Sequence, residues 1–553
     1  MRQGALDIDS PESLVKKHTG CVALNQLAHG FTKELRPSLG LLIEGVGRHK
    51  PYFIPQVNAL RPGSAFNWRL GGLLNRAGVG LASPFGAAKT TKRCIEDLFI
   101  TEKVLKCSLL LGLTRTGEIR VYQSFNHKKN DNGTKKNMTS NSIVIVGGGH
   151  SGAQLCASLA ELGQGSRIHL VCEEPVLPYQ RPPLSKAFFK KAGESAQSIR
   201  AASWYEQQGI QVHLGDPVKS VDPDKHIVQL SSGQTLSYAH LVLATGTRAR
   251  QLPSLPTNLD NVHTLRTAQD ANHLRAALES VKRVTFIGGG FIGLELAATL
   301  QSLGKHVTVL ESQPRLLSRA VSAELSAHVL STHQAAGLDV RMESQIKGFE
   351  FESHRVTRIE LANENLEVEC VVLGIGAEPE DALARQIGLT CEQGIVVDAH
   401  MKTSHSHIWA VGDCTRFPWT NDMTTLRLES VQNANDQARV AAQSIMGQMV
   451  SYQPVPWFWS EQGSMRLQMV GLMPQLPHVA HTVRRPFTAP AQPASGENAG
   501  FSLFHYQGER LVCVETVNAP MEHMMARKIL EQGLSPSPSA VADTATPLKN
   551  WLT

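Results

Sequence analysis

Two segments of the sequence, about 140 residues apart, repeat the same local pattern. The first begins with Ile143–Val146, an unbroken run of β-branched residues of the kind that a buried parallel strand requires. Gly147, Gly149 and Gly152 follow at the spacing G-x-G-x-x-G, and a helical pattern comes directly after them. A second strand is expected at residues 167–172, which would complete a β-α-β unit.

The second copy of this pattern lies near the middle of the chain and has the same parts. We expect strands at residues 284–287 and His306–Leu310, with a helical pattern between them. Two such units imply two homologous nucleotide-binding domains, and 553 residues are enough for about three domains in all. The glycines of the second loop are Gly288, Gly290 and Gly293.

The spacing of the glycines has a physical reason. The first permits a tight turn, the second lets a pyrophosphate approach the backbone, and the third lets the helix pack closely on the strand. The helix N-terminus offers free N–H groups to phosphates. An acid that ends the second strand can bond the ribose hydroxyls, and Glu173 and Glu311 occupy these positions. One such loop would be weak evidence, but two complete units predict two dinucleotide sites.

Further motifs indicate which dinucleotide each unit binds. Residues 177–186 place two adjacent prolines between Arg181 and Lys186, and we expect an extended segment there. Asp413 ends a hydrophobic strand, where its carboxylate could accept hydrogen bonds from the ribityl hydroxyls of a flavin. Another predicted strand ends in a turn formed by Ala244, Thr245 and Gly246.

The acid of the second unit also bears on the choice between NADH and NADPH. Glu311 repels a 2′-phosphate by its charge, which favours NADH. Arg315 lies close enough in sequence to keep that preference moderate. We therefore expect NADH, with NADPH less favoured.

The cysteines argue against a local redox or metal motif. No two of the nine lie within three residues of each other, so the sequence contains no Cys-x-x-Cys pair, and no metal site is predicted. Scattered cysteines of this kind are usually buried thiols. No apolar stretch approaches the roughly 20 residues of a membrane helix, and the first residues lack the layout of a secretory signal. We expect a cytoplasmic protein.

The first 137 residues differ from the rest of the chain. Residues 1–140 contain 21 Lys and Arg against 10 Asp and Glu, whereas the remainder contains 33 against 38. Periodicity is weak here, and the polar tract at residues 126–138 is typical of a linker or of disorder. The sequence does not favour nucleic-acid binding, because no helical or aromatic pattern accompanies the charge. We interpret this basic extension as disordered or non-native, with translation starting at Met138.

From about residue 142 onward, the sequence resembles the FAD- and NADH-dependent ferredoxin reductases of Rieske dioxygenase and cytochrome P450 systems. The matching stretches run in family order over about 410 residues and include GGGHSG, RPPLSK, LVLATGTRAR, FIGGGFIGLELAA, IWAVGDC and PWFWSEQG. The resemblance implies an α/β fold with two Rossmann-like three-layer domains, as in glutathione reductase, and an α+β C-terminal domain. The implied ranges are 138–255 with 385–453 for FAD, 256–384 for NAD and 454–553 for the C-terminal domain.

The resemblance also implies the roles of individual residues. Lys186 and Glu295 are the expected catalytic residues, because the family's acid lies near the isoalloxazine and can pair with the lysine. Taken without the family, the two would be an ordinary ion pair. The implied FAD site comprises Gly147, Gly149, Gly152, Glu173, Arg181, Lys186, Ala244, Thr245, Gly246, Asp413 and Trp459. The implied NAD site comprises Gly288, Gly290, Gly293, Glu295, Glu311 and Gly376.

The activity implied by the resemblance is that of a ferredoxin–NAD(+) reductase. Hydride passes from NADH to FAD, and single electrons then pass to a [2Fe–2S] ferredoxin, which supplies a terminal oxygenase in aromatic hydrocarbon catabolism. A monomer or a dimer, without a membrane partner, is expected. Disulfide reductases are disfavoured because the helix after Gly152 contains only Cys156, with no partner nearby in sequence. An apoptosis-inducing-factor-like flavoprotein and an NADH oxidase acting on oxygen or peroxide remain as alternatives.

Overall fold

The computed structural model describes residues 108–113, 119–124, 141–191, 193–419, 424–474, 477–487 and 500–552. The chain forms two compact units, Met1–Lys136 and Asn137–Thr553. In the first, strands β1 (Ser108–Leu113) and β2 (Ile119–Ser124) pair antiparallel. The predicted linker at residues 126–138 and the proposed start at Met138 lie outside the described residues.

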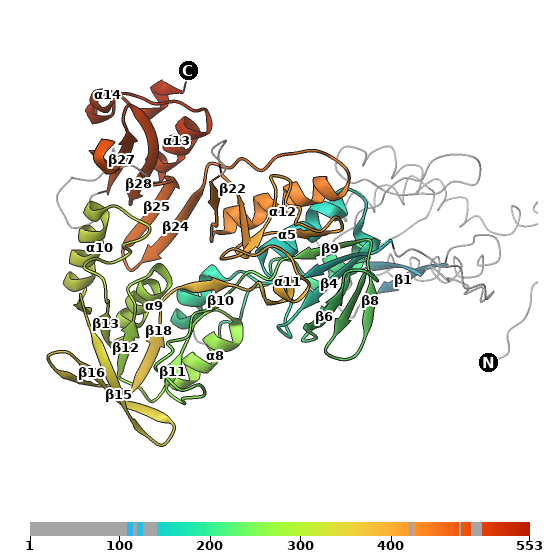
Figure 1. The fold of residues 1–553 in the computed structure, drawn as a ribbon, viewed down its shortest axis with the longest axis horizontal. Coiled ribbons are helices and arrows are strands. Elements are labelled where there is room, and N and C mark those ends of the chain that lie inside the picture. The colour runs from blue at the N-terminus through green and yellow to red at the C-terminus, as the bar shows by residue number, and fades with distance from the viewer. Residues whose placement is uncertain are drawn as a thin grey trace, which may run out of the picture. The chain divides into compact units, whose positions relative to one another are not determined.

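The second unit contains a five-stranded parallel sheet built around the first glycine-rich segment (Figure 1). Strand β3 lies at its centre and is completely buried, which is why its sequence is continuously apolar rather than alternating. Helices α5 (His150–Glu161) and α12 (Val431–Ile445) pack against each other beside it. The strands, in spatial order, are β21 (Ile408–Ala410), β9 (His240–Leu243), β3 (Ile143–Val146), β4 (Ile168–Cys172) and β5 (Gln211–Leu214).

A second parallel sheet is built around the second glycine-rich segment and has the same local topology. Helix α9 (Phe291–Ser302) connects its two central strands, and α8 (Ala268–Ala277) and α10 (Ala323–Ala335) belong to the same region of the chain. Both predicted β-α-β units are therefore confirmed. The strands, in spatial order, are β11 (Val262–His263), β18 (Cys370–Leu373), β12 (Arg283–Ile287), β13 (His306–Leu310) and β14 (Asp339–Arg341).

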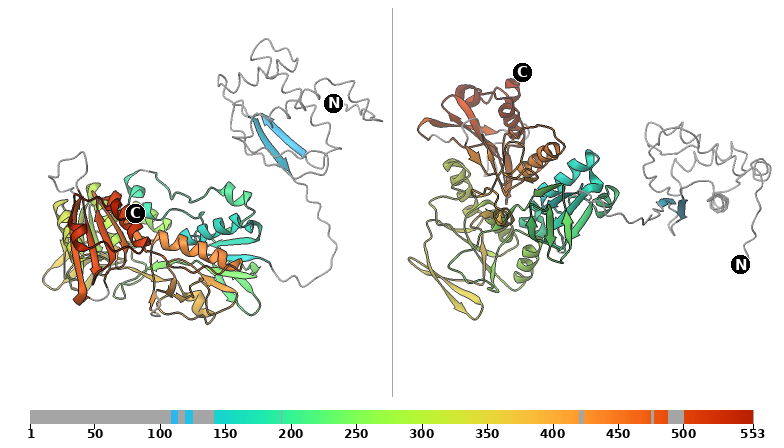
Figure 2. Two further views of the ribbon diagram at one scale, coloured as in Figure 1. Left: turned by 90° about the horizontal axis from the view of Figure 1, so that it is seen from above. Right: turned by 45° about the vertical axis from the view of Figure 1, so that its right-hand side comes forward.

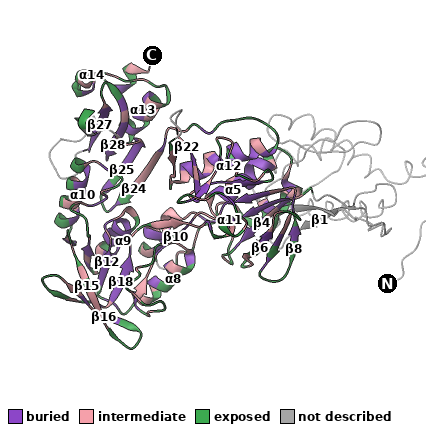
Figure 3. Cartoon of the chain, in the orientation of Figure 1, coloured by how far each residue is buried: buried purple, intermediate pink, exposed green. Residues whose placement is uncertain are grey.

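Smaller elements, most of them antiparallel, accompany the two parallel sheets. A three-stranded meander is inserted between β5 and β9 of the first sheet and another between β14 and β18 of the second, and the meander of the second sheet is mostly exposed or half-buried (Figure 3). The chain passes between the two sheets through a short ribbon in which β10 pairs with β19. The elements are β6 (Val218–Asp222), β7 (Ile227–Leu230), β8 (Thr235–Ser237), β10 (Thr247–Ala249), β15 (Ile346–Glu352), β16 (Arg355–Leu361), β17 (Asn365–Glu367), β19 (Ala377–Pro379), β20 (Ile395–Val396), β22 (Thr415–Pro418) and β23 (Thr425–Leu426), with α7 (Ala202–Gln207) and α11 (Ala382–Gln386).

The C-terminal part of the chain is a five-stranded antiparallel sheet with helix α13 (Pro520–Glu531) packed on it (Figure 2). The predicted mixed α/β fold with an α+β C-terminal domain is thus confirmed. The strands, in spatial order, are β24 (Trp457–Gln462), β25 (Met465–Gly471), β28 (Arg510–Val517), β27 (Gly500–Gln507) and β26 (Ala480–Phe487), followed by α14 (Pro538–Ala542).

Two local expectations differ from the structure. The prolines of residues 177–186 begin a 3₁₀ helix, Pro182–Ser185, and α6 (Ala187–Lys190) follows it, so this segment is not simply extended. Proline suits the first turn of a helix because its fixed φ is already helical and its missing N–H needs no partner there. Residues 485–498 are rich in Pro, Ala and Gly, which predicts a longer loop in the C-terminal domain, but Pro486 lies in β26 at the edge of its sheet, a position that tolerates proline.

Candidate functional site

The first glycine-rich loop contacts the turn after β9 so closely that side chains are excluded. A Cβ on Gly147 would lie 2.2 Å from the carbonyl oxygen of Ala244, and the φ of Gly147 is +124°. A Cβ on Gly152 would lie 2.0 Å from the carbonyl oxygen of Gly147. At Gly149, by contrast, a Cβ would meet nothing within 4 Å. The loop is therefore closed toward the sheet and open at its second glycine.

The open side of this loop faces a cavity of about 990 Å³, which we call the first cavity. The strand ends of the first sheet, the 3₁₀ helix at 182–185, the start of α9 and strand β24 all contribute to its wall. Gly152 supports the loop from behind and does not line the cavity. The other residues predicted for FAD line it: Gly147, Gly149, Glu173, Arg181, Lys186, Ala244, Thr245, Gly246, Asp413 and Trp459.

The second glycine-rich loop lines a cavity of about 1490 Å³, the second cavity. A Cβ on Gly288 would lie 2.6 Å from the carbonyl oxygen of Gly374, so this position also excludes a side chain. Gly290, Gly293, Glu311 and Gly376, which the resemblance assigned to an NAD site, line this same cavity. Glu295, also predicted for the NAD site, lies on α9 and faces the first cavity instead, because its carboxylate is directed to Lys186.

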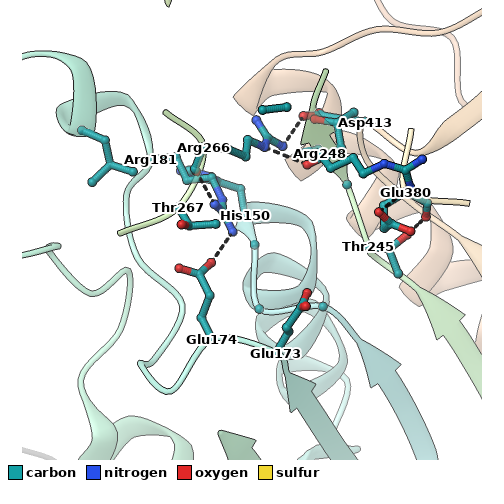
Figure 4. A pocket seen from close by; sticks show the side chains of 18 of the residues that line it. His150, Glu173, Glu174, Arg181, Thr245, Arg248, Arg266, Thr267, Glu380 and Asp413 are labelled. Carbon is teal, nitrogen blue, oxygen red and sulfur yellow. Dashed lines mark hydrogen bonds and ion pairs between the residues drawn. The ribbon is translucent and has the colours of Figure 1, made fainter. Parts of the chain in front are cut away.

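The two strand-end acids are held differently. Glu173 is exposed, and its side chain has no hydrogen-bond partner among the described residues (Figure 4). Glu311 accepts hydrogen bonds from the backbone N–H of Gly289 at 2.7 Å and of Gln313 at 2.8 Å. The second acid is thereby fixed to its own glycine-rich loop, whereas the first is free to bond a ligand.

Lys186 and Glu295 form a buried ion pair in the wall of the first cavity. Lys186 Nζ lies 2.6 Å from Glu295 Oε2, and the hydroxyl of Ser185 donates to the same oxygen at 2.6 Å. The ammonium group also donates to the carbonyl oxygen of Pro182 at 3.1 Å. A cation is therefore anchored at the cavity wall by a carboxylate from the neighbouring domain.

Arg181 gives the first cavity a positive charge and also connects two segments of its wall. Its guanidinium pairs with Glu174 at 2.8 Å and donates to the carbonyl oxygen of Arg266 at 2.7 Å. Tyr179 donates to the same Glu174 carboxylate at 2.7 Å. These bonds connect the segment after β4 to the segment before α8, on the far side of the cavity.

Asp413 faces Arg266 at the end of the first sheet. Their side chains lie 3.3 Å apart (Figure 4). Burial raises the pKa of Asp413 above its usual range, and the nearby Arg266 partly offsets this effect. Thr247, in the same wall, has a buried hydroxyl without a partner in the described part of the chain. Both polar groups are thus available to a ligand with hydroxyl groups.

Aromatic side chains form the boundary at which the two cavities adjoin. Phe291 and Phe458 pack edge to face, with ring centroids 4.7 Å apart, and both line both cavities. Trp459 lines the first cavity and Trp457 the second, and their rings are stacked at 5.8 Å. Ligands in the two cavities would meet at this boundary.

The cysteines near the first cavity are not arranged for thiol chemistry. Cys156 was expected to have no partner, but the structure brings Cys172 near enough to influence its pKa. Both are free and buried, and burial raises the pKa of Cys156 strongly and that of Cys172 to about 12. Because the thiolate is the reactive form, neither is poised as a nucleophile at neutral pH.

Several site residues lay beyond the sequence-based prediction. Arg266 had no role assigned, and Glu174 was passed over for its neighbour. A charged residue beside a predicted strand end was the available signal for Glu174, whereas no strand was predicted next to Arg266. Phe291 and Phe458 gave no such signal, because an apolar side chain in a loop or strand does not reveal which cavity it lines.

The wall of the first cavity fits a dinucleotide, and the second cavity is lined by the same kind of glycine-rich loop before a helix N-terminus. A glycine that only a ligand approaches, an unpaired buried hydroxyl and a free acid at a strand end are features that an adenine dinucleotide would satisfy. Among the described residues, no group of three or more His, Cys, Asp or Glu side chains could hold a metal ion. None of the described helices has the length and apolar character needed to cross a bilayer.

The fold and the two adjoining cavities define an oxidoreductase that brings two dinucleotides together. The chain belongs to the pyridine nucleotide-disulphide oxidoreductase family, whose sequence profile matches residues 141–438, and the reductase C-terminal profile matches residues 457–552. Membership of this family implies FAD and a pyridine nucleotide as cofactors.

Known proteins similar to the chain include reductases named for a ferredoxin or another redoxin. It is 39% identical to rhodocoxin reductase of Rhodococcus erythropolis over 410 residues, 74% of this chain and 93% of that protein. The ferredoxin reductase of the CYP199A2 system of Rhodopseudomonas palustris is 37% identical, with a TM-score of 0.69 over 75% of this chain and all of that one. The reductase of the covalent putidaredoxin reductase–putidaredoxin complex is 37% identical, with a TM-score of 0.68 over 75% and 98%.

Proposed function

We propose that the protein is an FAD-dependent NADH:ferredoxin reductase. The observation that carries the proposal is the meeting of two dinucleotide cavities at Phe291 and Phe458, directly beside the buried pair of Lys186 and Glu295. When bound, FAD supplies the chemistry that accepts a hydride and releases single electrons. The chain supplies position, charge and exclusion of water.

The first cavity is proposed as the FAD site. Gly149 leaves room for a pyrophosphate at the N-terminus of α5, and Glu173 is free to bond the adenosine ribose. Asp413 and Thr247 offer polar atoms to the ribityl hydroxyls at the other end of the sheet. Lys186 holds a positive charge at the wall, where it would stabilise negative charge that develops on a bound ring system.

The second cavity is proposed as the site of NADH rather than NADPH. Glu311 is fixed at the mouth of the glycine-rich loop, where its charge opposes a 2′-phosphate. Arg315, which seemed from the sequence to moderate this preference, donates instead to the carbonyl oxygens of Val321 and Ser318 at 2.7 and 2.6 Å. Its guanidinium is therefore engaged away from the cavity, which favours a stronger preference for NADH.

A [2Fe–2S] ferredoxin is the proposed electron acceptor. Support comes from the relatives, among them a reductase solved in a covalent complex with putidaredoxin and a ferredoxin reductase of a cytochrome P450 system. The buried, high-pKa thiols of Cys156 and Cys172 argue against disulfide reduction. A terminal oxygenase, of the P450 or ring-hydroxylating type, would then consume the electrons.

The test is NADH-driven reduction of a panel of [2Fe–2S] ferredoxins by the purified full-length chain. We expect a yellow protein that reduces at least one ferredoxin much faster with NADH than with NADPH. Rapid NADH consumption with oxygen or peroxide but with none of the ferredoxins would instead identify an NADH oxidase. A stable NADH-bound form without turnover would indicate a binding protein, and a colourless preparation would contradict the FAD site.

A further inference from the structure

The carboxylate of Glu295 has more partners than its ion pair requires. Its Oε2 accepts from Lys186 and Ser185, whereas its Oε1 accepts from the hydroxyl of Ser460 at 2.7 Å and from the backbone N–H of Glu461 at 3.3 Å. Ser460 lies on β24 of the C-terminal sheet and is 1% exposed. A residue outside both parallel-sheet regions thus hydrogen-bonds the second carboxylate oxygen of Glu295.

The Ser460 hydroxyl is itself oriented by a buried hydrogen-bond chain. Gln462 Nε2 donates to Ser460 Oγ at 3.1 Å, and Gln462 Oε1 lies 2.8 Å from His333 Nε2 on α10. Since Gln462 uses its amide nitrogen toward Ser460, its oxygen faces the histidine, and His333 must donate from Nε2. Burial lowers the pKa of His333, which keeps the ring neutral in this donor form.

All the hydrogen bonds in the series from His333 to Glu295 have the same donor-to-acceptor direction. His333 donates to Gln462, Gln462 to Ser460, and Ser460 to Glu295, so each dipole presents its positive end toward the carboxylate. Aligned bonds strengthen one another in a buried environment. If the side-chain amide of Gln462 were flipped, the Ser460 hydroxyl would donate to the amide oxygen and would present only an oxygen lone pair to Glu295. Only the observed arrangement lets every residue in the series make a favourable hydrogen bond.

We propose that Ser460, oriented by Gln462 and His333, is a positioning residue that holds the Glu295 carboxylate against Lys186 and so sets the electrostatic field over the first cavity. The inference rests on the proposed function, because it assigns this field to a bound flavin. Without the serine hydroxyl, the negative charge on Glu295 Oε1 is less neutralised. Reduction of a ring beside the ion pair then becomes less favourable.

The experiment measures the midpoint potential of the bound flavin by reductive titration against a reference dye, which requires neither NADH nor ferredoxin. We expect Ser460→Ala to bind FAD and to have a more negative potential than the wild type. We also expect hydride transfer from NADH to slow roughly tenfold, because the loss of one hydrogen bond to a charged group has about this effect on a rate. The KM for NADH should be almost unchanged. Ser460→Thr, which keeps the hydroxyl, should restore both values.

Two further variants separate positioning from a merely structural role. Ser464→Ala changes an exposed serine in the turn after β24 and should leave the potential at its wild-type value. In a Glu295→Gln background, Ser460→Ala should cause no additional shift, because the carboxylate through which it acts is gone. A lower melting temperature with an unchanged potential, or an equal shift in the Glu295→Gln background, would overturn the proposal. If none of the ferredoxins were reduced but the flavin potential still shifted in Ser460→Ala, only the proposed electron acceptor would be refuted, and the role of Ser460 would stand.

Discussion

The two glycine-rich loops share one design but differ in how tightly they are closed. In the first, added Cβ atoms on Gly147 and Gly152 would lie 2.2 and 2.0 Å from backbone oxygens. The corresponding distances for Gly288 and Gly293 in the second are 2.6 and 3.2 Å. The first loop therefore has no room to adjust, whereas the second can yield by a few tenths of an ångström at its third glycine.

Outside the glycine-rich loops, the wall of the first cavity is again the more tightly bonded of the two. Both cavities are lined by segments from the regions of both parallel sheets and from β24, but in the first the bonds of Arg181 and Glu295 connect these segments across the cavity. In the second cavity, the acid Glu311 is bonded mainly to its own loop. From this comparison we expect the first site to retain its ligand and the second to exchange it, as the proposed flavin and nicotinamide sites would require.

The largest expected effect concerns the third glycine of each loop. Gly152→Ala places a methyl group 2.0 Å from the carbonyl oxygen of Gly147, and we expect it to destabilise the protein by about 3 kcal/mol or more and to abolish FAD retention. Gly293→Ala meets its nearest atom at 3.2 Å and should cost about 1 kcal/mol. Urea unfolding, with flavin absorbance measured after gel filtration, tests both. Equal losses would show that the two loops are equally tight.

The next effect concerns Asp413, which belongs to the tighter site. Asp413→Asn removes a charged acceptor while preserving shape, and we expect FAD to bind roughly tenfold more weakly, as the loss of one charge-assisted hydrogen bond implies. Equilibrium titration of the apoprotein with FAD measures this change. An unaltered affinity would mean that Asp413 only pairs with Arg266.

The pH dependence of the apoprotein gives an independent check on Asp413. Burial raises the pKa of this carboxyl in the folded protein, so between its unfolded and folded pKa values the native state binds more protons than the unfolded state. The contribution of Asp413 to the free energy of unfolding therefore falls as the pH rises through that window. Asp413→Asn should lack this decline, and the difference between the two unfolding curves isolates it.

The sequence was sufficient for the parts of the fold that depend on local pattern. The runs at Ile143–Val146 and His306–Leu310 became strands with those bounds. The first is apolar throughout because the strand is covered on both faces. Three local expectations changed. Proline geometry alone did not distinguish an extended segment from the 3₁₀ turn at Pro182–Ser185, and Pro486 proved to lie in an edge strand. Cys156 gained Cys172 as a neighbour because α5 packs on β4.

The candidate site was less accessible to sequence reasoning because its bonds join distant segments. Nothing near Ser460 in sequence indicates that its hydroxyl reaches Glu295, 165 residues earlier. The same holds for Arg181 and the carbonyl oxygen of Arg266, 85 residues apart. Motifs locate the residues that touch a dinucleotide, whereas the packing of three sheets determines which side chains hold those residues in place.

An effect of similar size, on cofactor selectivity rather than on retention, is expected at the looser site. Glu311→Ala removes the charge that opposes a 2′-phosphate, and we expect the ratio of kcat/KM for NADH to that for NADPH to fall roughly tenfold, because one close charge pair contributes about 1.4 kcal/mol. Arg315→Ala is the control, since its guanidinium is bonded to carbonyl oxygens outside the cavity. If Arg315→Ala lowered NADPH turnover markedly, the arginine would reach the cavity during binding.

The smallest effect is expected at Arg248, which lines both cavities from the ribbon that joins the two sheets. Its guanidinium pairs with Glu378 at 3.1 Å and Glu380 at 2.9 Å, but the side chain is 54% exposed. Exposed ion pairs contribute about 0.2–1 kcal/mol and are screened by salt. Arg248→Ala should therefore lower the stability by less than about 1 kcal/mol, and the difference should disappear in high salt. If Arg248→Ala selectively weakened the binding of FAD or of NADH, Arg248 would belong to the site of the cofactor that is lost. The two cavities would then differ less in how their walls hold a ligand.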